Sequence, residues 1–165
     1  MTISPVRFLI FHNPQVSRSA ELARQIEHYL QQQARARAEC ALVSDVNQGP
    51  PEGADILLAV GGDGTMLRVG RVGARVGCPV LGFNLGQVGF LPQVPEHEWR
   101  AALERVLAGD FELERRMLVF GELVRHGETL TGHHALNEIV VTRGALARPV
   151  RLETEVDGAA LTNYV

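Results

Sequence analysis

At residues 56–65 the chain reads ILLAVGGDGT, and this stretch decides its fold. Five apolar residues in a row are typical of a strand that is buried on both faces of a sheet. Three glycines and one acid follow directly, and residues 65–76 have the composition of a helix. A strand that enters a helix through a glycine-rich loop is typical of the ligand-binding edge of a doubly wound sheet. We therefore predict a mainly parallel sheet with a site beyond the carboxyl end of this strand.

The neighbouring segments alternate between strand-like and helix-like patterns, which predicts βαβ units. An amphipathic helix is expected at residues 19–37, where Leu22, Ile26 and Leu30 recur four residues apart. Further strands are expected at residues 6–11, 38–43 and 79–83, and further helices at residues 65–76 and 95–108. Gly109 is expected to end the last of these helices.

The pattern changes after Gly109. Residues 117–124, 129–142 and 150–156 are strand-like and are separated by His-Gly, Arg-Gly and Asp-Gly turns. We predict an α/β, Rossmann-like domain at residues 1–109 and a β-rich domain of the β-sandwich type at residues 110–165. These strands are too few to close a sandwich, so we expect the second domain to be incomplete and the chain to be a fragment.

Composition excludes several classes of function. The net charge of −3 does not indicate a nucleic-acid partner. All 16 basic residues of the 165 are Arg, which excludes a Walker-type phosphate loop and chemistry that depends on Lys. The longest apolar run, at residues 56–60, is far too short to span a membrane. The two cysteines, Cys40 and Cys78, lack metal-binding spacing, and a cytoplasmic location is expected.

Asp63 is the one acid in the glycine-rich loop. The glycines allow a phosphate or ribose to approach the backbone, and positive φ angles there would align N–H groups as an anion nest. A carboxylate beside such amides suits binding a metal ion or accepting a proton from a hydroxyl, which are tasks of a phosphotransferase. The alternative is that Asp63 only caps the helix.

A second glycine-rich stretch, FNLGQVGFLP at residues 83–92, follows the next strand and should lie at the same sheet edge. Asn84 offers an amide for hydrogen bonds. Phe90 can stack on a base or cover the core, and core packing is the commoner role of Phe.

The third stretch is ALNEIVVTRG at residues 135–144, which is expected to be an apolar strand interrupted by Asn137 and Glu138. Ribose hydroxyls would satisfy both polar side chains, whereas an edge strand would leave Glu138 in solvent. Arg68 and Arg148 could pair with a phosphate or carboxylate, although solvent-facing Arg is the commoner case.

Together, GGDGTML at 61–67, NLGQVGFL at 84–91 and ALNEIVV at 135–141 resemble the motifs of the NAD kinase family. The resemblance implies ATP-dependent phosphorylation of the 2′-hydroxyl of the adenosine ribose of NAD, with NADP as product. It implies these roles: Asp63 as general base, Gly64 along the dinucleotide, Phe90 beside the adenine, Asn137 and Glu138 on ribose hydroxyls, and Arg148 near the nucleotide. Arg68 is a weaker carry-over.

The resemblance also implies a divalent metal ion, with magnesium favoured, ATP or polyphosphate as phosphoryl donor, and a homodimer or homotetramer. The family's downstream Asp-Gly and Thr-Pro-Thr-Gly-Ser-Thr-Ala-Tyr stretches have no counterpart before Val165, and Val88 stands where the family often has Leu. Two rival functions stay open, a lipid kinase of the diacylglycerol or sphingoid type and a non-catalytic nucleotide-binding module. The adjacent Asn137 and Glu138 favour NAD kinase over a lipid kinase.

Overall fold

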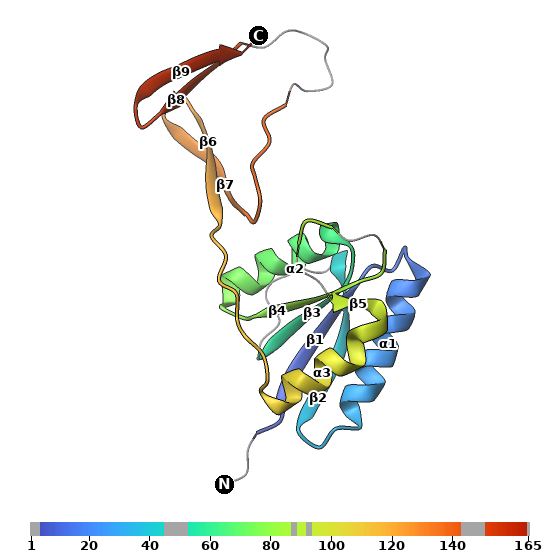
Figure 1. Ribbon diagram of the computed structural model, residues 1–165. Helices are drawn as coiled ribbons and strands as arrows, with labels where there is room; N and C mark the ends of the chain where they lie inside the picture. Colours follow the sequence, from blue (N-terminus) through green and yellow to red (C-terminus); the bar gives the residue numbers. More distant parts are fainter. Residues whose placement is uncertain (1–3, 45–52, 87–88, 92–93, 143–150, 165) are drawn as a thin grey trace.

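The computed structural model describes residues 4–44, 53–86, 89–91, 94–142 and 151–164. Its amino-terminal part contains a five-stranded parallel sheet with the order β2-β1-β3-β4-β5 (Figure 1). The strands are β1 (Val6–His12), β2 (Ala36–Leu42), β3 (Ile56–Gly61), β4 (Val80–Asn84) and β5 (Val94–Pro95). Because β2 and β3 lie on opposite sides of β1, the chain reverses its direction across the sheet between β1 and β3. Parallel sheets bind ligands at such a switch point.

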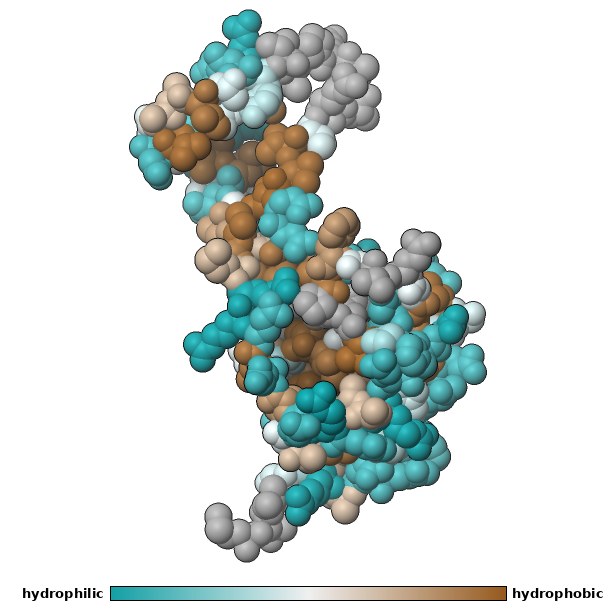
Figure 2. Space-filling model, in the orientation of Figure 1, coloured by the Kyte–Doolittle hydropathy of each residue, from teal (hydrophilic) through white to brown (hydrophobic). Residues whose placement is uncertain are grey.

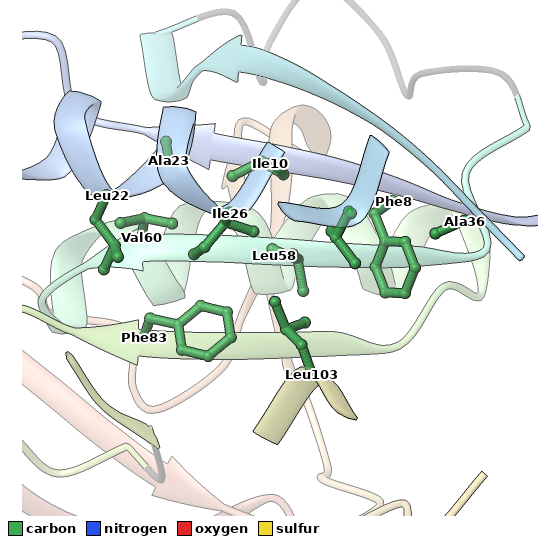
Figure 3. Close-up of a cluster of buried hydrophobic side chains, with 11 residues drawn as sticks. Phe8, Ile10, Leu22, Ala23, Ile26, Ala36, Leu58, Val60, Phe83 and Leu103 are labelled. Carbon is green, nitrogen blue, oxygen red and sulfur yellow. The ribbon is translucent and has the colours of Figure 1, made fainter. Parts of the chain in front are cut away.

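Helices cover both faces of this sheet. One face carries α1 (Ser17–Gln31) and α3 (Trp99–Ala108), which follows the short 3₁₀ helix η2 (Glu96–Glu98), and the other carries α2 (Asp63–Val76) (Figure 1). Alternate residues of β3 point to opposite faces, so Leu58 packs with α1 and α3 while Leu57 packs with α2. Figure 3 shows Leu58 in the first of these clusters, with Leu103 of α3. The parallel α/β architecture is therefore confirmed.

The predicted helix at residues 19–37 is too long at its carboxyl end, because α1 stops at Gln31. The sequence changes period there: Ala36, Ala38 and Cys40 alternate with Arg37 and Glu39, and the small apolar members of this series face the α1 core. A period of two is the pattern of a half-buried strand, so these residues form β2 instead of another helical turn.

Two glycines shape the carboxyl end of α2. A Cβ on Gly73 would lie 2.6 Å from the carbonyl oxygen of Cys78 and 2.6 Å from Val80 Cγ2, so this glycine lets the helix approach the start of β4. Gly77 ends the helix with a φ of +68°. The glycines that weaken this helix in isolation thus permit its close packing on the sheet.

Beyond α3 the chain forms two antiparallel hairpins, β6 (Val119–Arg125) with β7 (Glu128–Ala135), and β8 (Leu152–Val156) with β9 (Ala159–Tyr164). Both turn residues of each hairpin, His126–Gly127 and Asp157–Gly158, have positive φ angles, as two-residue hairpin loops prefer. The hairpins extend away from the parallel sheet (Figure 1), and Figure 2 shows hydrophobic side chains gathered on their surface. Among the residues described, no helix has the length and apolar character to cross a membrane.

His12 at the end of β1 should make stability depend on pH. Burial lowers its pKa from 6.5, as does Arg24, whereas Glu27 acts in the opposite direction. Within the described ranges its Nδ1 is buried without a hydrogen-bond partner. The imidazole of His12 therefore binds a proton more readily in the unfolded chain than in the folded protein. The stability that neutral His12 contributes is complete above the unfolded pKa. It is lost as the pH falls from the unfolded pKa through the lower, folded pKa.

We expect the urea midpoint of the natural protein to fall more than that of His12→Gln between about pH 7.5 and about pH 5.5, the range in which histidine titrates. Other titrating groups are common to both proteins and cancel in the comparison. Equal falls in the two midpoints would contradict a role for His12.

Candidate functional site

The carboxyl ends of β1, β3 and β4 meet at a pocket of about 260 Å³, here called the switch-point pocket. Asn13 follows β1, Gly61 ends β3, and Asn84 ends β4, and all three line it. Gly61 and Asn84 are paired neighbours in the sheet. The two glycine-rich stretches therefore lie at one sheet edge, as the sequence predicts.

Ser19 of α1 fixes the geometry of this pocket. Its side chain is completely buried, and its Oγ accepts a hydrogen bond from the N–H of Asn13 at 2.9 Å. The same hydroxyl donates to the carbonyl oxygen of Val60 at 2.7 Å. One side chain thus holds the loop after β1 against the end of β3.

We expect Ser19→Ala to destabilise the protein by about 1–3 kcal/mol. The substitution removes the buried hydroxyl that is hydrogen-bonded to both the N–H of Asn13 and the carbonyl of Val60. Urea unfolding followed by circular dichroism measures the loss. The matched control is Ser17→Ala, at an exposed position in the same helical turn. A similar loss in both variants would contradict the role of the Ser19 hydroxyl.

The glycine-rich loop uses its glycines differently from our expectation. None of Gly61, Gly62 and Gly64, all within the described residues, has a positive φ, so the predicted left-handed anion nest is wrong. Gly61 is needed because the Thr65 side chain packs over it, with Thr65 Cβ 2.8 Å from where a Cβ of Gly61 would lie. Gly62 occupies the N-cap position of α2, and Asp63 is the first residue of the helix. Asp63 is therefore not the N-cap residue.

The Asp63 carboxylate is held by the second glycine-rich stretch. Its Oδ2 accepts a hydrogen bond from the N–H of Phe90 at 2.9 Å. Both carboxylate oxygens lie too close to where a Cβ of Gly89 would be, so any side chain at residue 89 would force the Asp63 carboxylate or its loop to shift. Asp63 and the loop that carries Phe90 are thus one structural unit.

A larger pocket, of about 810 Å³, adjoins this unit and is here called the outer pocket. Gly89 and Phe90 line it, together with Asn84 at the end of β4. Its lining also includes Arg18 of α1 and Glu96 of η2. The outer pocket therefore extends from the loop that contacts Asp63 to the amino-terminal ends of α1 and α3.

Phe90 does not pack in the core, which corrects that expectation. Its side chain is 96% exposed beside the outer pocket, whereas Leu91 next to it is buried. The backbone hydrogen bond to Asp63 fixes the position of Phe90 and leaves its ring free to stack on a flat ligand.

Asn137 and Glu138 are exposed and lie outside any strand, so the strand expected at residues 129–142 is wrong beyond Ala135. Leu136 packs beside α2, with its Cδ2 3.5 Å from where a Cβ of Gly70 would lie. Gly70 is seven residues after Asp63, on the same helix face and about 10 Å further along the axis. Residues 136–138 thus lie beside α2, and none of these described residues lines the switch-point pocket or the outer pocket.

Arg68 is exposed on α2, about 140° around the helix from Asp63. The structure therefore does not bring its side chain to the face of α2 that carries Asp63. Gly64 is exposed beside Asp63, and space for a ligand is open there because nothing lies within 4 Å of where its Cβ would be. Arg148 lies outside the described residues.

Comparison with known proteins agrees with this arrangement. The sequence profile of the ATP-NAD kinase N-terminal domain matches residues 33–111. An NAD kinase of Nitratidesulfovibrio vulgaris is 39% identical over 163 residues, which cover 95% of this chain and 54% of that protein. The chain belongs to the NAD kinase family. An NAD kinase of Geotalea daltonii is 46% identical over 114 residues, 69% of this chain and 40% of that protein.

The chain spans about half the length, or less, of these NAD kinase relatives. The crystal structure of yeast NADH kinase complexed with NADH superposes with a TM-score of 0.74. That match covers 97% of this chain and 55% of the yeast chain at 22% identity, and it establishes the similarity of the folds.

Four residues at the pockets were missed by the sequence analysis. Asn13 directly follows a strand at the ligand-binding edge, and that position was a signal that sequence reasoning could have used. Ser19 gave no signal, because its role depends on a contact 41 residues away along the chain. Arg18 and Glu96 are even further apart in sequence, and only the fold brings them together.

Proposed function

We propose that the protein is an NAD kinase, which transfers the γ-phosphoryl group of ATP to the 2′-hydroxyl of the adenosine ribose of NAD and so makes NADP. The observation that carries this proposal is the Asp63 carboxylate at the start of α2, bonded to the N–H of Phe90 next to two pockets. It lies at the edge where parallel sheets bind ligands. Membership of the NAD kinase family supports the choice of substrates.

In the proposed reaction the Asp63 carboxylate accepts the proton of the ribose hydroxyl while the hydroxyl oxygen attacks the γ-phosphorus. A bond forms between that oxygen and phosphorus, the bond from phosphorus to the ADP oxygen breaks, and ADP leaves. Phosphoryl transfer depends mainly on positioning and charge neutralisation, so the protein need form no covalent intermediate. Gly64 would lie along the dinucleotide, Phe90 beside the adenine, and Asn137 and Glu138 at ribose hydroxyls.

We further propose a divalent cation, magnesium, that arrives with the nucleotide. In the part of the chain that the structure describes, no three His, Cys, Asp or Glu side chains are grouped to hold a metal ion. Magnesium usually binds through substrate phosphates and water with few protein ligands, so we propose that the nucleotide phosphates hold it. When bound, the cation neutralises phosphoryl charge. The resemblance to the family supports a place near the bound nucleotide for Arg148 and, more weakly, for Arg68, whose side chain lies on another face of α2 than Asp63.

The remaining proposals concern location, assembly and domains. Cys40 and Cys78 are free thiols, which supports a reducing, cytoplasmic location. The resemblance to the family supports a homodimer or homotetramer. The end of α3 at Gly109 and the hairpins beyond it support a domain boundary near that residue.

The test is NADP formation from NAD, ATP and magnesium, run on the 165-residue chain and on the product of its complete reading frame. Parallel reactions replace ATP with polyphosphate, or NAD with diacylglycerol. NADP formation in either protein supports the proposal. Transfer to the lipid alone, or nucleotide binding with no transfer in either protein, would contradict it.

A further inference from the structure

The outer pocket contains an ion pair that the proposed reaction does not use. Arg18, in the first turn of α1, and Glu96 of η2 are joined by a distance of 2.6 Å between Nη2 and Oε2. The Arg18 side chain is 66% exposed and that of Glu96 is 28% exposed. Both side chains line the outer pocket. Among the described residues, the Arg18 guanidinium is thus paired at the pocket with one partly exposed carboxylate.

This pair is well suited to being exchanged for a ligand. An exposed ion pair contributes little to folding, because water and side-chain entropy offset the attraction. An arginine forms stronger, bidentate hydrogen bonds with phosphoryl oxygens than a neutral donor does. Glu96, in contrast, repels an anion unless it stays paired or turns away. Arg18 therefore favours a phosphate in this pocket, and Glu96 competes with it.

The pocket also has the size and the aromatic surface that a nucleotide needs. Its volume of about 810 Å³ lies within the range of small-molecule sites. Phe90 offers an exposed ring for a base, and Arg18 offers a cation for phosphates. Asp63 contacts Gly89 and Phe90 of the lining, so a nucleotide bound here lies next to the proposed general base.

We propose that Arg18 is a specificity-determining residue that binds phosphoryl oxygens of a nucleotide in the outer pocket, and that Glu96 restrains it in competition with that nucleotide. The inference rests on the proposed function and adds to it a phosphate-recognition residue. The phosphates can be those of the donor, ATP, or of the acceptor, NAD, and the experiment separates the two.

Isothermal titration calorimetry, on the 165-residue chain and on the product of its complete reading frame, measures binding of ATP, NAD and adenosine separately. We expect Arg18→Gln to weaken binding of one phosphorylated ligand by about tenfold to a hundredfold, the effect of losing a charged hydrogen bond. Glu96→Gln should raise the affinity for the same ligand by about twofold to fivefold, because the competing ion pair is lost. Neither variant should change adenosine binding, which involves no phosphate.

The matched control is Arg105→Gln. Arg105 is also 66% exposed and is paired with Asp110 at 2.9 Å, in the last turn of α3 and away from the outer-pocket lining. It should leave all three affinities unchanged. The ligand that Arg18→Gln weakens identifies which nucleotide places its phosphates there.

The opposite signs of the two changes are the decisive readout. A merely structural ion pair predicts that both variants act in the same direction, and that result, or an equal loss for adenosine, would overturn the inference. If the natural chain binds ATP or NAD and Arg18→Gln binds it equally well, the inference fails while the proposed function stands. If neither the 165-residue chain nor the product of its complete reading frame binds ATP or NAD, both are overturned.

Discussion

Asp63→Asn is expected to lower kcat for NADP formation by about 10²–10⁴-fold, the usual contribution of a positioned general base. The amide has nearly the shape of the carboxylate, and its side-chain oxygen can still accept the hydrogen bond from Phe90. The substitution therefore removes the proton acceptor and keeps the loop in place. NAD affinity should stay within about tenfold of the natural value, because little ground-state binding is lost.

Steady-state kinetics with NAD as the varied substrate, combined with direct measurement of NAD binding, tests this expectation. Asp110→Asn makes the same chemical change at a side chain paired with Arg105, and it should behave like the natural protein. Natural turnover in Asp63→Asn would exclude Asp63 as the base. A parallel loss of NAD affinity and turnover would assign it to binding instead.

Gly89→Ala is expected to reduce kcat by about a hundredfold, which is the scale of the effect when a reacting group is displaced by about 1 Å. The new methyl group would clash with the Asp63 carboxylate. That carboxylate, or the loop that carries Phe90, must move, and the hydrogen bond between them would be strained or broken. Residue 89 is exposed, so the urea midpoint should barely change.

Gly70→Ala is the control for this substitution. It adds the same methyl group on α2, where the nearest atom outside the helix is Leu136 Cδ2 at an ordinary 3.5 Å. Full activity in Gly70→Ala with strongly reduced activity in Gly89→Ala would support the contact between Gly89 and Asp63. Equal activity in the two variants would show that the carboxylate position is not critical.

The parallel sheet could be predicted from the sequence because local patterns determine it. The apolar run at residues 56–60 is buried from both sides by α1, α2 and α3, and that burial requires the continuous hydrophobic pattern seen in the sequence. The start of β2 was predicted less well. Residues 34–38 alternate Ala and Arg, which are good helix formers, so local propensity did not reveal that tertiary packing makes this segment a strand.

The candidate site was predicted in its outline and not in its contacts. The meeting of the two glycine-rich stretches follows from parallel topology, which places the ends of neighbouring strands together. The bond between Asp63 and Phe90 joins residues 27 positions apart, and their spacing alone does not reveal it. The exposure of Phe90 was missed because Phe is usually buried, whereas here a backbone hydrogen bond to Asp63 holds residue 90 beside the outer pocket.

Trp99 is the only tryptophan of the chain and lies where α3 meets α1. Its ring meets that of Tyr29 edge to face, with centroids 5.4 Å apart, and the Arg100 guanidinium lies 5.1 Å from the Trp99 centroid. Its intrinsic fluorescence therefore reports the packing of α3 against α1 within the α/β part. Comparing an emission melt with a backbone melt would separate the unfolding of the two parts without any added label.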